Sequence, residues 1–337
     1  MQVTNREEEA RAHVERAELK GSISTKNLTF RYPESQTKLF GYNKFFNELI
    51  NLYKSNKLPN KILFSGPKGI GKSTLAYHFI NFVLSLDEKC KYDIKNFAIN
   101  AESSAYKTII NKSNLNFIKI DILPDKKFID INQIRNLINS LNKSSLNDKP
   151  RFVLIDNIEQ LNKSSINALL KILEEPNKNI NFILINNNKK ILKTLLSRCI
   201  NFKIHLSHKE CLNISNQILN TELDNLVHPD LINYYFTPGN IYKLVKFSEI
   251  NNYKLSDYDL KDFLIIMIKD NQFKKDSFIR YIIFDFVEFY LRKLNKSFSS
   301  RINNKYNYFL KRISDTKTFN LDEESLFTEI KENVLNG

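Results

Sequence analysis

From about residue 38 to residue 206, short continuous apolar runs alternate with longer amphipathic stretches. Continuous runs are typical of strands buried on both faces of a parallel sheet, because a half-exposed strand alternates apolar and polar residues instead. The pattern therefore predicts five buried strands. Their sequences are KILFSG (61–66), FIKIDIL (117–123), RFVLID (151–156), NFILIN (181–186) and CINFKI (199–204).

The stretches between these strands have helical spacing. In INQIRNLINSLN (131–142) the apolar residues stand at 131, 134, 137, 138 and 141, which places them on one face of a helix. The other predicted helices are FNELINLYKSN (46–56), KSTLAYHFINFVLSL (72–86) and SSINALLKILEEP (164–176). Strands that alternate with helices predict an α/β fold, a parallel five-stranded sheet with flanking helices.

After about residue 206 the strand pattern stops. Residues 207–248 predict short helices, broken at His228-Pro229 and Pro238-Gly239, and residues 258–337 are helical again. Within them DSFIRYIIFDFVEFYLRKLN carries a wide apolar stripe, which packs against other helices of the chain or of a second subunit. The predicted parts are a charged, poorly anchored extension (1–25), an α/β domain (26–205), a helical segment (206–250) and a C-terminal helical domain (251–337).

The charge composition indicates an affinity for polyanions. The 337 residues carry 51 Lys+Arg against 37 Asp+Glu, a net charge of +14. Such a surplus favours nucleic acid. However, the chain is also rich in Lys, Asn and Ile, as expected from an AT-rich genome, so composition alone can explain the lysines.

Cysteine usage and hydropathy predict a cytoplasmic protein. Cys90, Cys199 and Cys211 form no CxxC pair, which argues for a reducing compartment without a disulfide framework or a cysteine zinc site. The apolar run FLIIMI (263–268) is far too short to span a bilayer, and the N-terminal residues lack the apolar core of a secretory signal. We therefore expect no membrane partner.

The strongest chemical signal is GPKGIGKS (66–73), which matches G-x-x-x-x-G-K-[ST] between a predicted strand and a predicted helix. The glycines let backbone N–H groups face phosphate oxygens, and the helix N-terminus adds a partial positive charge. Lys72 would reach the β- and γ-phosphates and Ser73 would offer its hydroxyl to Mg²⁺. The motif predicts ATP or GTP binding. The predicted binding residues are Gly66, Pro67, Lys68, Gly69, Ile70, Gly71, Lys72, Ser73 and Thr74.

A second strand supplies the metal carboxylate. Asp156 ends the strand 151–156, where it would hold Mg²⁺ together with Ser73. Asn157 follows, at the position where P-loop ATPases often carry a second acid. An amide accepts a hydrogen bond but cannot act as a general base. The pair predicts metal and nucleotide binding with weakened activation of water.

Three blocks together resemble clamp-loader ATPases, the AAA+ proteins that place ring-shaped sliding clamps on primed DNA. They are GPKGIGKSTLAYHF, NALLKILEEP (167–176) and Ser197-Arg198-Cys199. Within that group the chain is most similar to the delta-prime subunits of bacterial DNA polymerase III. The resemblance covers roughly residues 38–250 and implies an AAA+ P-loop module, a small helical lid and a C-terminal helical collar. It also implies other clamp-loader subunits (gamma/tau-type and delta-type), a sliding clamp and primed DNA as partners.

The resemblance also implies roles for single residues. LFGYN (39–43) would lie near the adenine of ATP. Asn186 matches the sensor 1 position, where an amide orients the attacking water. Arg198 would be an arginine finger, acting in trans on the developing charge of a neighbouring subunit's γ-phosphoryl group. Standing alone, Arg198 would be read as an ordinary surface arginine.

The chain departs from the family pattern at three places. Many relatives carry four zinc cysteines between the first helix and the second strand, where this chain has only Cys90, so we expect no zinc. In FTPGNIYKL (236–244), Asn240 stands where active subunits often have the sensor 2 arginine. Asn157 replaces the catalytic acid. These departures predict a subunit that binds ATP and Mg²⁺ and turns ATP over poorly.

Two alternatives compete with an assembly subunit that supplies Arg198 to a neighbour. One is an active gamma/tau-type motor subunit, which predicts an acid at position 157 and zinc cysteines. The other is a P-loop small-molecule kinase, in which the SRC block and the helical C-terminal region have no role.

Overall fold

The computed structural model describes residues 32–123, 126–142, 147–174, 179–232, 236–295, 300–319 and 321–335. The predicted charged extension, residues 1–25, lies outside the described residues.

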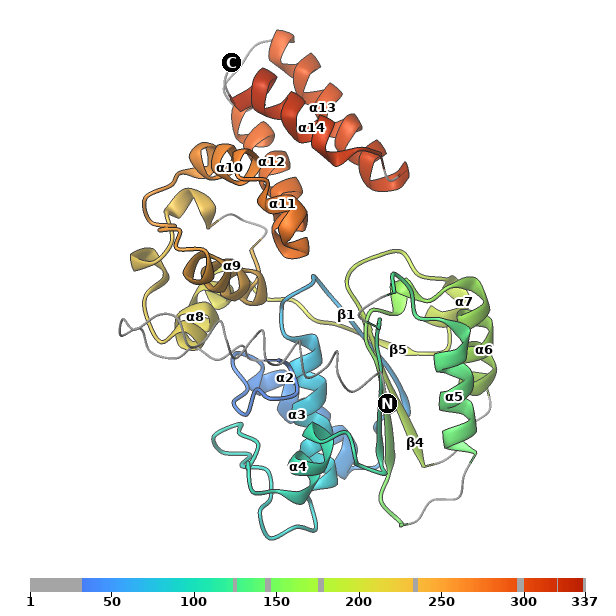
Figure 1. The fold of residues 1–337 in the computed structure, drawn as a ribbon. Helices are drawn as coiled ribbons and strands as arrows, with labels where there is room; N and C mark the ends of the chain where they lie inside the picture. The colour runs from blue at the N-terminus through green and yellow to red at the C-terminus, as the bar shows by residue number, and fades with distance from the viewer. Residues whose placement is uncertain are drawn as a thin grey trace, which may run out of the picture. The chain divides into compact units, whose positions relative to one another are not determined.

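A five-stranded parallel sheet forms the N-terminal module (Figure 1). Its strand order is β2-β3-β4-β1-β5, and every neighbouring pair is parallel. The predicted parallel sheet is thus confirmed. The strands are β1 (Lys61–Ser65), β2 (Phe117–Ile120), β3 (Arg151–Ile155), β4 (Ile180–Asn186) and β5 (Ile200–Lys203).

Helices cover both faces of this sheet, with α2, α3 and α4 on one side and α5, α6 and α7 on the other (Figure 1). They are α2 (Asn43–Lys54), α3 (Lys72–Leu84), α4 (Ser104–Ile110), α5 (Ile131–Leu141), α6 (Lys163–Glu174) and α7 (Lys193–Leu196). In β3, Phe152 and Leu154 join the hydrophobic cluster of α2 and α3, whereas Val153 and Ile155 join that of α5 and α6. Successive side chains of a strand point to opposite faces, so a strand covered on both sides must be apolar throughout.

The helix α4 was missed by the sequence analysis, and its capping explains why. Its first N–H groups are bound by Glu88: Oε2 accepts from Ser104 N and Oε1 from Ala105 N, each at 2.9 Å. Ser103 adds a local cap by accepting from Tyr106 N. Helix N-termini need such acceptors, and here one comes from a residue far outside the helix. A short helix that depends on a remote carboxylate leaves little periodic signal.

After β5 the chain is helical. The helix α8 (His208–Leu219) opens with a capping box between Ser207 and Glu210, and α9 (Pro238–Ile250) opens with Thr237 as N-cap and Pro238 in its first turn. Proline fits the first helical turn because its missing N–H would have no partner there. The dipeptide Pro238-Gly239, predicted as a break, is therefore the start of a helix.

The remaining helices share one hydrophobic cluster, which runs from Leu219 to Leu335. The stripe predicted in 276–295 is buried in α12 at Ile279, Ile282, Ile283, Phe286, Val287 and Leu291, so it packs within the chain. The cluster includes residues on both sides of position 250, and the predicted domain limits stay predictions. The helical elements are α10 (Leu260–Lys269), α11 (Gln272–Lys275), α12 (Ser277–Asn295), α13 (Ser300–Phe319), α14 (Glu323–Ile330) and the π-helical turn η4 (Lys331–Leu335). In the described part of the chain, no helix has both the length and the apolar character needed to cross a lipid bilayer.

A buried histidine makes the stability of the module depend on pH. The ring of His78 in α3 is fully buried, with Nδ1 2.8 Å from Tyr92 Oη and Nε2 2.9 Å from the carbonyl oxygen of Gln36. Burial lowers its pKa from 6.5 to about 4, against a smaller opposing effect of the Gln36 carbonyl. Below pH 6.5 the imidazole takes up a proton in the unfolded chain but stays neutral in the folded chain. The free energy of unfolding is therefore highest, as far as His78 is concerned, above pH 6.5, and it falls as the pH drops toward 4.

We therefore expect the free energy of unfolding to fall by about 3 kcal/mol between pH 7 and pH 4 on account of His78. Urea unfolding across this range measures the loss. His78→Gln removes the titrating ring and should flatten the profile, whereas His205→Gln, at an exposed position, should leave it as steep as in the wild type. Equal steepness in all three proteins would contradict the assignment.

Candidate functional site

The loop 66–71 joins β1 to α3 at the carboxyl edge of the sheet. Gly69 and Gly71 have φ angles of +87° and +93°, values that side chains with a Cβ rarely adopt. At Gly66 a Cβ would lie 2.2 Å from the backbone oxygen of Ile204, which follows β5. Each glycine of the motif thus meets a geometric requirement, and the loop lies between β1 and the N-terminus of α3 as predicted.

Lys72 is buried at the start of α3, with 3% of its surface exposed. Its ammonium donates to the carbonyls of Gly66 (2.9 Å) and Pro67 (2.7 Å) and to Asn187 Oδ1 (2.9 Å). Burial lowers the pKa of Lys72 to about 8, although the charges of Asp156 and Glu159 oppose the shift. The loop therefore holds a positive charge where a phosphate group would bind, and three oxygens keep that charge in place.

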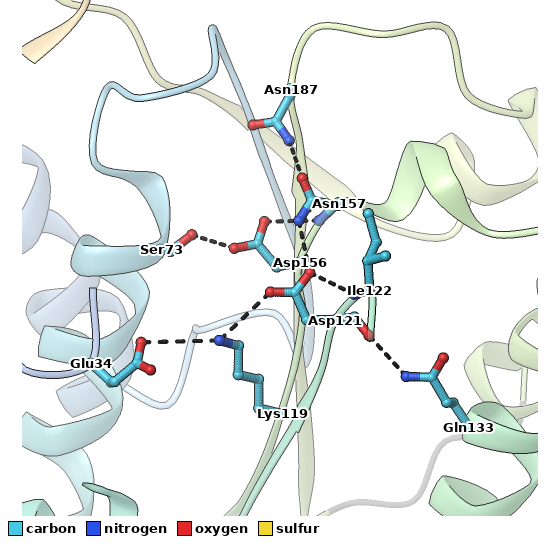
Figure 2. Close-up of polar contacts among 9 residues, drawn as sticks. All are labelled: Glu34, Ser73, Lys119, Asp121, Ile122, Gln133, Asp156, Asn157 and Asn187. Atoms are coloured by element: carbon cyan, nitrogen blue, oxygen red, sulfur yellow. Dashed lines mark hydrogen bonds and ion pairs between the residues drawn. The ribbon is translucent and has the colours of Figure 1, made fainter. Parts of the chain in front are cut away.

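Ser73 and Asp156 meet beside the loop (Figure 2). Ser73 Oγ donates to Asp156 Oδ2 at 2.5 Å, which joins α3 to the end of β3. Burial raises the pKa of Asp156, the Ser73 hydrogen bond lowers it, and the nearby charge of Asp121 raises it further. A hydroxyl and a carboxylate in contact are hard oxygen donors that suit Mg²⁺, which takes one or two protein ligands and completes its shell with water and phosphate oxygens.

Asn157 follows β3 and connects the ends of the two strands on either side of it, β2 and β4 (Figure 2). Its Nδ2 donates to Asp121 Oδ1 and its Oδ1 accepts from Asn187 Nδ2, each at 2.8 Å. Its φ of +53° lies in the left-handed region, which asparagine tolerates better than most residues. The amide thus uses both its donor and its acceptor, whereas an ionised carboxylate could supply only the acceptor.

Asn187 and Glu159 belong to this site and were missed by the sequence analysis. Asn187 Nδ2 donates to Glu159 Oε1 at 2.9 Å as well as to Asn157, and its oxygen binds Lys72. The predicted sensor residue, Asn186, instead donates to the carbonyl of Lys189 at 2.9 Å. Three identical residues, Asn186-Asn187-Asn188, stand in a row, so the sequence alone does not tell which amide enters the site. Consecutive residues at a strand end point to different sides, and Asn187 is the one whose side chain reaches Lys72. The sensor 1 role of Asn186 stays a prediction.

Arg198 lies away from the loop, against the surface of its own module. Its Nη1 donates to the carbonyl of Thr194 in α7 at 2.7 Å, and its Nη2 pairs with Glu174 at the end of α6. Cys199 is buried, and burial raises the pKa of its thiol to about 11. The structure therefore brings Lys72, Ser73, Asp156 and Asn157 together and keeps Arg198 apart, and the finger role stays a prediction.

Two other segments contact the loop. The N-terminus of α9 touches it directly: Thr237 Oγ1 donates to the carbonyl of Lys68 at 3.0 Å and Gly239 N to that of Gly69 at 2.9 Å. Asn240 lies in the same turn, with Oδ1 3.1 Å from where a Cβ on Gly69 would be. From 39–43, Tyr42 Oη donates to the carbonyl of Ile70 at 2.5 Å. The predicted adenine and sensor 2 segments thus border the loop, while their roles stay predictions.

The described residues contain no group of three or more His, Cys, Asp or Glu side chains that could hold a metal ion. Cys90 is partly buried, and Cys211, like Cys199, is buried. The expectation of a protein without zinc remains an expectation.

Comparison with known proteins identifies relatives of this chain. A family model described as "DNA polymerase III, delta subunit" matches residues 41–208, about half of the chain. The delta' subunit of DNA polymerase III from Buchnera aphidicola (subsp. Schizaphis graminum) is 26% identical over 291 residues, which are 81% of this chain and 84% of that protein. The gamma subunit from the same organism is 30% identical over 189 residues, or 56% of this chain.

This chain spans about half the length (50%) of that gamma relative. Among solved structures, a DNA polymerase III gamma-subunit-related protein from Thermotoga maritima is similar, with a TM-score of 0.43 and 15% identity over 84% of this chain and 96% of that one.

The similarity includes the loop 66–71, the end of β3 and the SRC block, because the family match runs from residue 41 to residue 208. The relatives include both delta' and gamma/tau subunits. With its AAA+ module followed by a series of helices, the chain belongs to the clamp-loader subunits of DNA polymerase III.

Proposed function

We propose that this chain is a delta-prime-type subunit of the clamp loader, which binds ATP with Mg²⁺ and assists hydrolysis in a neighbouring subunit. One observation carries the proposal: a phosphate loop that holds the Lys72 ammonium, with Ser73 hydrogen-bonded to Asp156 next to it, lies beside an amide, Asn157, that cannot take a proton from water. The site is equipped to hold a nucleotide and poorly equipped to hydrolyse it.

On this proposal the loop backbone and the side chains around it have separate roles in binding ATP and Mg²⁺. The backbone N–H groups of 66–71 face the phosphates, and Lys72 exchanges its carbonyl partners for phosphate oxygens. Ser73 and Asp156 would hold Mg²⁺, which neutralises charge on the β- and γ-phosphates when bound. Thr237 and Gly239 bind carbonyls of the same loop, so α9 is positioned beside the proposed phosphate site.

The partners follow from the family and belong to the proposal. They are gamma/tau-type and delta-type clamp-loader subunits in a hetero-oligomeric ring, with the sliding clamp and primed DNA reached through that complex. The net charge of +14 suits an assembly on DNA. A cytoplasmic location is the matching expectation.

The active motor subunit of gamma/tau type is the second candidate, since gamma and tau subunits are among the relatives. The residue at position 157 separates the two. A motor needs an acid that orients and deprotonates water, and here the amide is bound on both sides. A small-molecule kinase finds no support, because the family match covers the α/β module and the SRC block.

We expect Lys72→Ala to weaken ATP binding by roughly tenfold or more, because a charge-assisted contact to phosphate contributes about 1.5–3 kcal/mol. Fluorescence titration with a labelled ATP analogue and Mg²⁺ measures the affinity of the isolated chain. Lys171→Ala removes a lysine from an exposed position in α6 and should bind like the wild type. Equal affinity in all three proteins would show that the loop is not a nucleotide site.

We expect Arg198→Ala to lower the ATPase rate of the reconstituted complex by about 10³-fold at the affected site, the lower end of the contribution of an arginine finger. The steady-state rate with clamp and primed DNA is the measurement. Lys193→Ala removes the same charge from the neighbouring surface and should leave the rate unchanged. A wild-type rate for Arg198→Ala would exclude the arginine from catalysis.

A further inference from the structure

Every backbone carbonyl of the loop residues 66–70 accepts a hydrogen bond. The donors, in loop order, are Lys72 Nζ to Gly66 and Pro67, Thr237 Oγ1 to Lys68 (3.0 Å), the N–H of Gly239 to Gly69 (2.9 Å) and Tyr42 Oη to Ile70 (2.5 Å). Three of these carbonyls are therefore held by two segments that are distant in the sequence, one just before α2 and one at the start of α9.

A donor that holds a carbonyl also orients the N–H group of the next residue. In a planar trans peptide group the C=O and the N–H point in opposite directions. The Tyr42 hydroxyl therefore directs the N–H of Gly71 away from itself, and the Thr237 hydroxyl does the same for the N–H of Gly69. Both N–H groups belong to the loop backbone that would face phosphate oxygens.

Gly69 and Gly71 are the loop residues for which such a restraint matters most. Their φ angles are +87° and +93°. Glycine adopts positive and negative φ about equally readily, and it loses more conformational freedom on ordering than any other residue. If nothing held the two peptide groups, a ligand would have to order them on binding, at a cost in affinity.

The two hydroxyls act from fixed positions, because both side chains are buried. Burial raises the pKa of Tyr42, with smaller contributions from Cys211 and Glu210, so the phenol stays protonated and can donate. Thr237 Oγ1 accepts from Asn240 N at 3.4 Å as the N-cap of α9, which leaves its single proton for the loop.

The close approach of α9 to the loop depends on two glycines. A Cβ on Gly69 would lie 2.4 Å from Thr237 Oγ1, and a Cβ on Gly239 would lie 2.7 Å from the carbonyl oxygen of Gly69. Both distances are too short for any side chain. The absence of a side chain at 69 and 239 thus lets the Thr237 hydroxyl reach the loop.

We propose that Tyr42 and Thr237 are positioning residues of the phosphate site, whose hydroxyls hold the loop so that the N–H groups of Gly71 and Gly69 already face the phosphates before a nucleotide binds. Tyr42 belongs to the segment 39–43, predicted to lie near the adenine, but its hydroxyl serves the triphosphate chain and not the base. This inference rests on the proposed nucleotide binding.

The test removes each hydroxyl from the full chain, with Tyr42→Phe and Thr237→Val. Affinity is measured by fluorescence titration with a labelled ATP analogue and by its displacement with inorganic triphosphate, both with Mg²⁺. We expect each variant to bind roughly three- to tenfold more weakly, the effect of one hydrogen bond. The factor should be the same for both ligands, because inorganic triphosphate has no base. Thr237→Ser keeps the hydroxyl and should bind like the wild type.

Two matched controls separate the loop contacts from general stability. Tyr53→Phe removes a hydroxyl from a partly exposed tyrosine of α2. Ser103→Ala removes a hydroxyl that, like that of Thr237, caps its own helix and donates to a distant residue, here Glu88. Both variants should keep the wild-type affinity, even where the loss of the cap lowers Tm.

A second measurement needs no ligand. ¹⁵N relaxation of the ligand-free chain gives order parameters for the N–H groups of Gly69 and Gly71, which lie near about 0.85 in a rigid backbone and below about 0.6 in a flexible one. We expect rigid values in the wild type, a fall at Gly71 in Tyr42→Phe, and a fall at Gly69 in Thr237→Val.

Order parameters that stay at the wild-type level in both variants would overturn the inference. It would also be overturned if Tyr42→Phe weakened the binding of ATP but not of inorganic triphosphate, because the hydroxyl would then act on the base. A wild-type chain that binds neither ligand would instead overturn the proposed function, and the order parameters would still decide whether the two hydroxyls hold the loop.

Discussion

The buried ammonium of Lys72 is the constraint on which the site depends. A charge taken out of water is tolerated only when it is paired or hydrogen-bonded. Two of its acceptors, the carbonyls of Gly66 and Pro67, come from the loop, and the third, Asn187, comes from the end of β4. The strand order places β4 between β1 and β3, so the residue that completes the lysine's shell also reaches Asn157. Lys72, the loop 66–71 and the two amides Asn157 and Asn187 are therefore connected by hydrogen bonds. The parallel strand order determines which side chains can join them.

These hydrogen bonds extend across three neighbouring strand ends. Asp121, Asn157 and Asn187 follow β2, β3 and β4, and each amide passes a hydrogen bond to the next group (Figure 2). Such a row is satisfied only if donors and acceptors alternate, since one wrong group leaves a neighbour without a partner. The row ends in acids on both sides, at Asp121 and at Glu159. The electrostatics of the site are thus set by the whole row, and the identity of residue 157 cannot be understood in isolation.

Most of the sheet could be predicted from sequence, because strands buried on both faces must be continuously apolar, as Phe152 to Ile155 are. The phosphate loop could be predicted because its glycines, Lys72 and Ser73 stand at fixed spacing. The strand order, α4 and the partners of Asn157 could not. The helix α4 depends on Glu88, and Asp121 reaches Asn157 from another strand, so both contacts exist only after the chain has folded. Asn186 and Asn187 are indistinguishable in sequence and are separated only by the direction of their side chains.

The two basic groups of the proposed mechanism are held with very different strength. Lys72 is buried among three oxygens, and a nucleotide must replace those contacts with phosphate. Arg198 is partly exposed and pairs with Glu174, whose side chain is 54% exposed, so the pair contributes about 0–1 kcal/mol. An arginine held this weakly on the surface would leave Glu174 at small cost if, as proposed, it acts on a neighbouring subunit's phosphoryl group. On the proposed function, the difference in burial between the two side chains would separate holding one nucleotide from assisting with another.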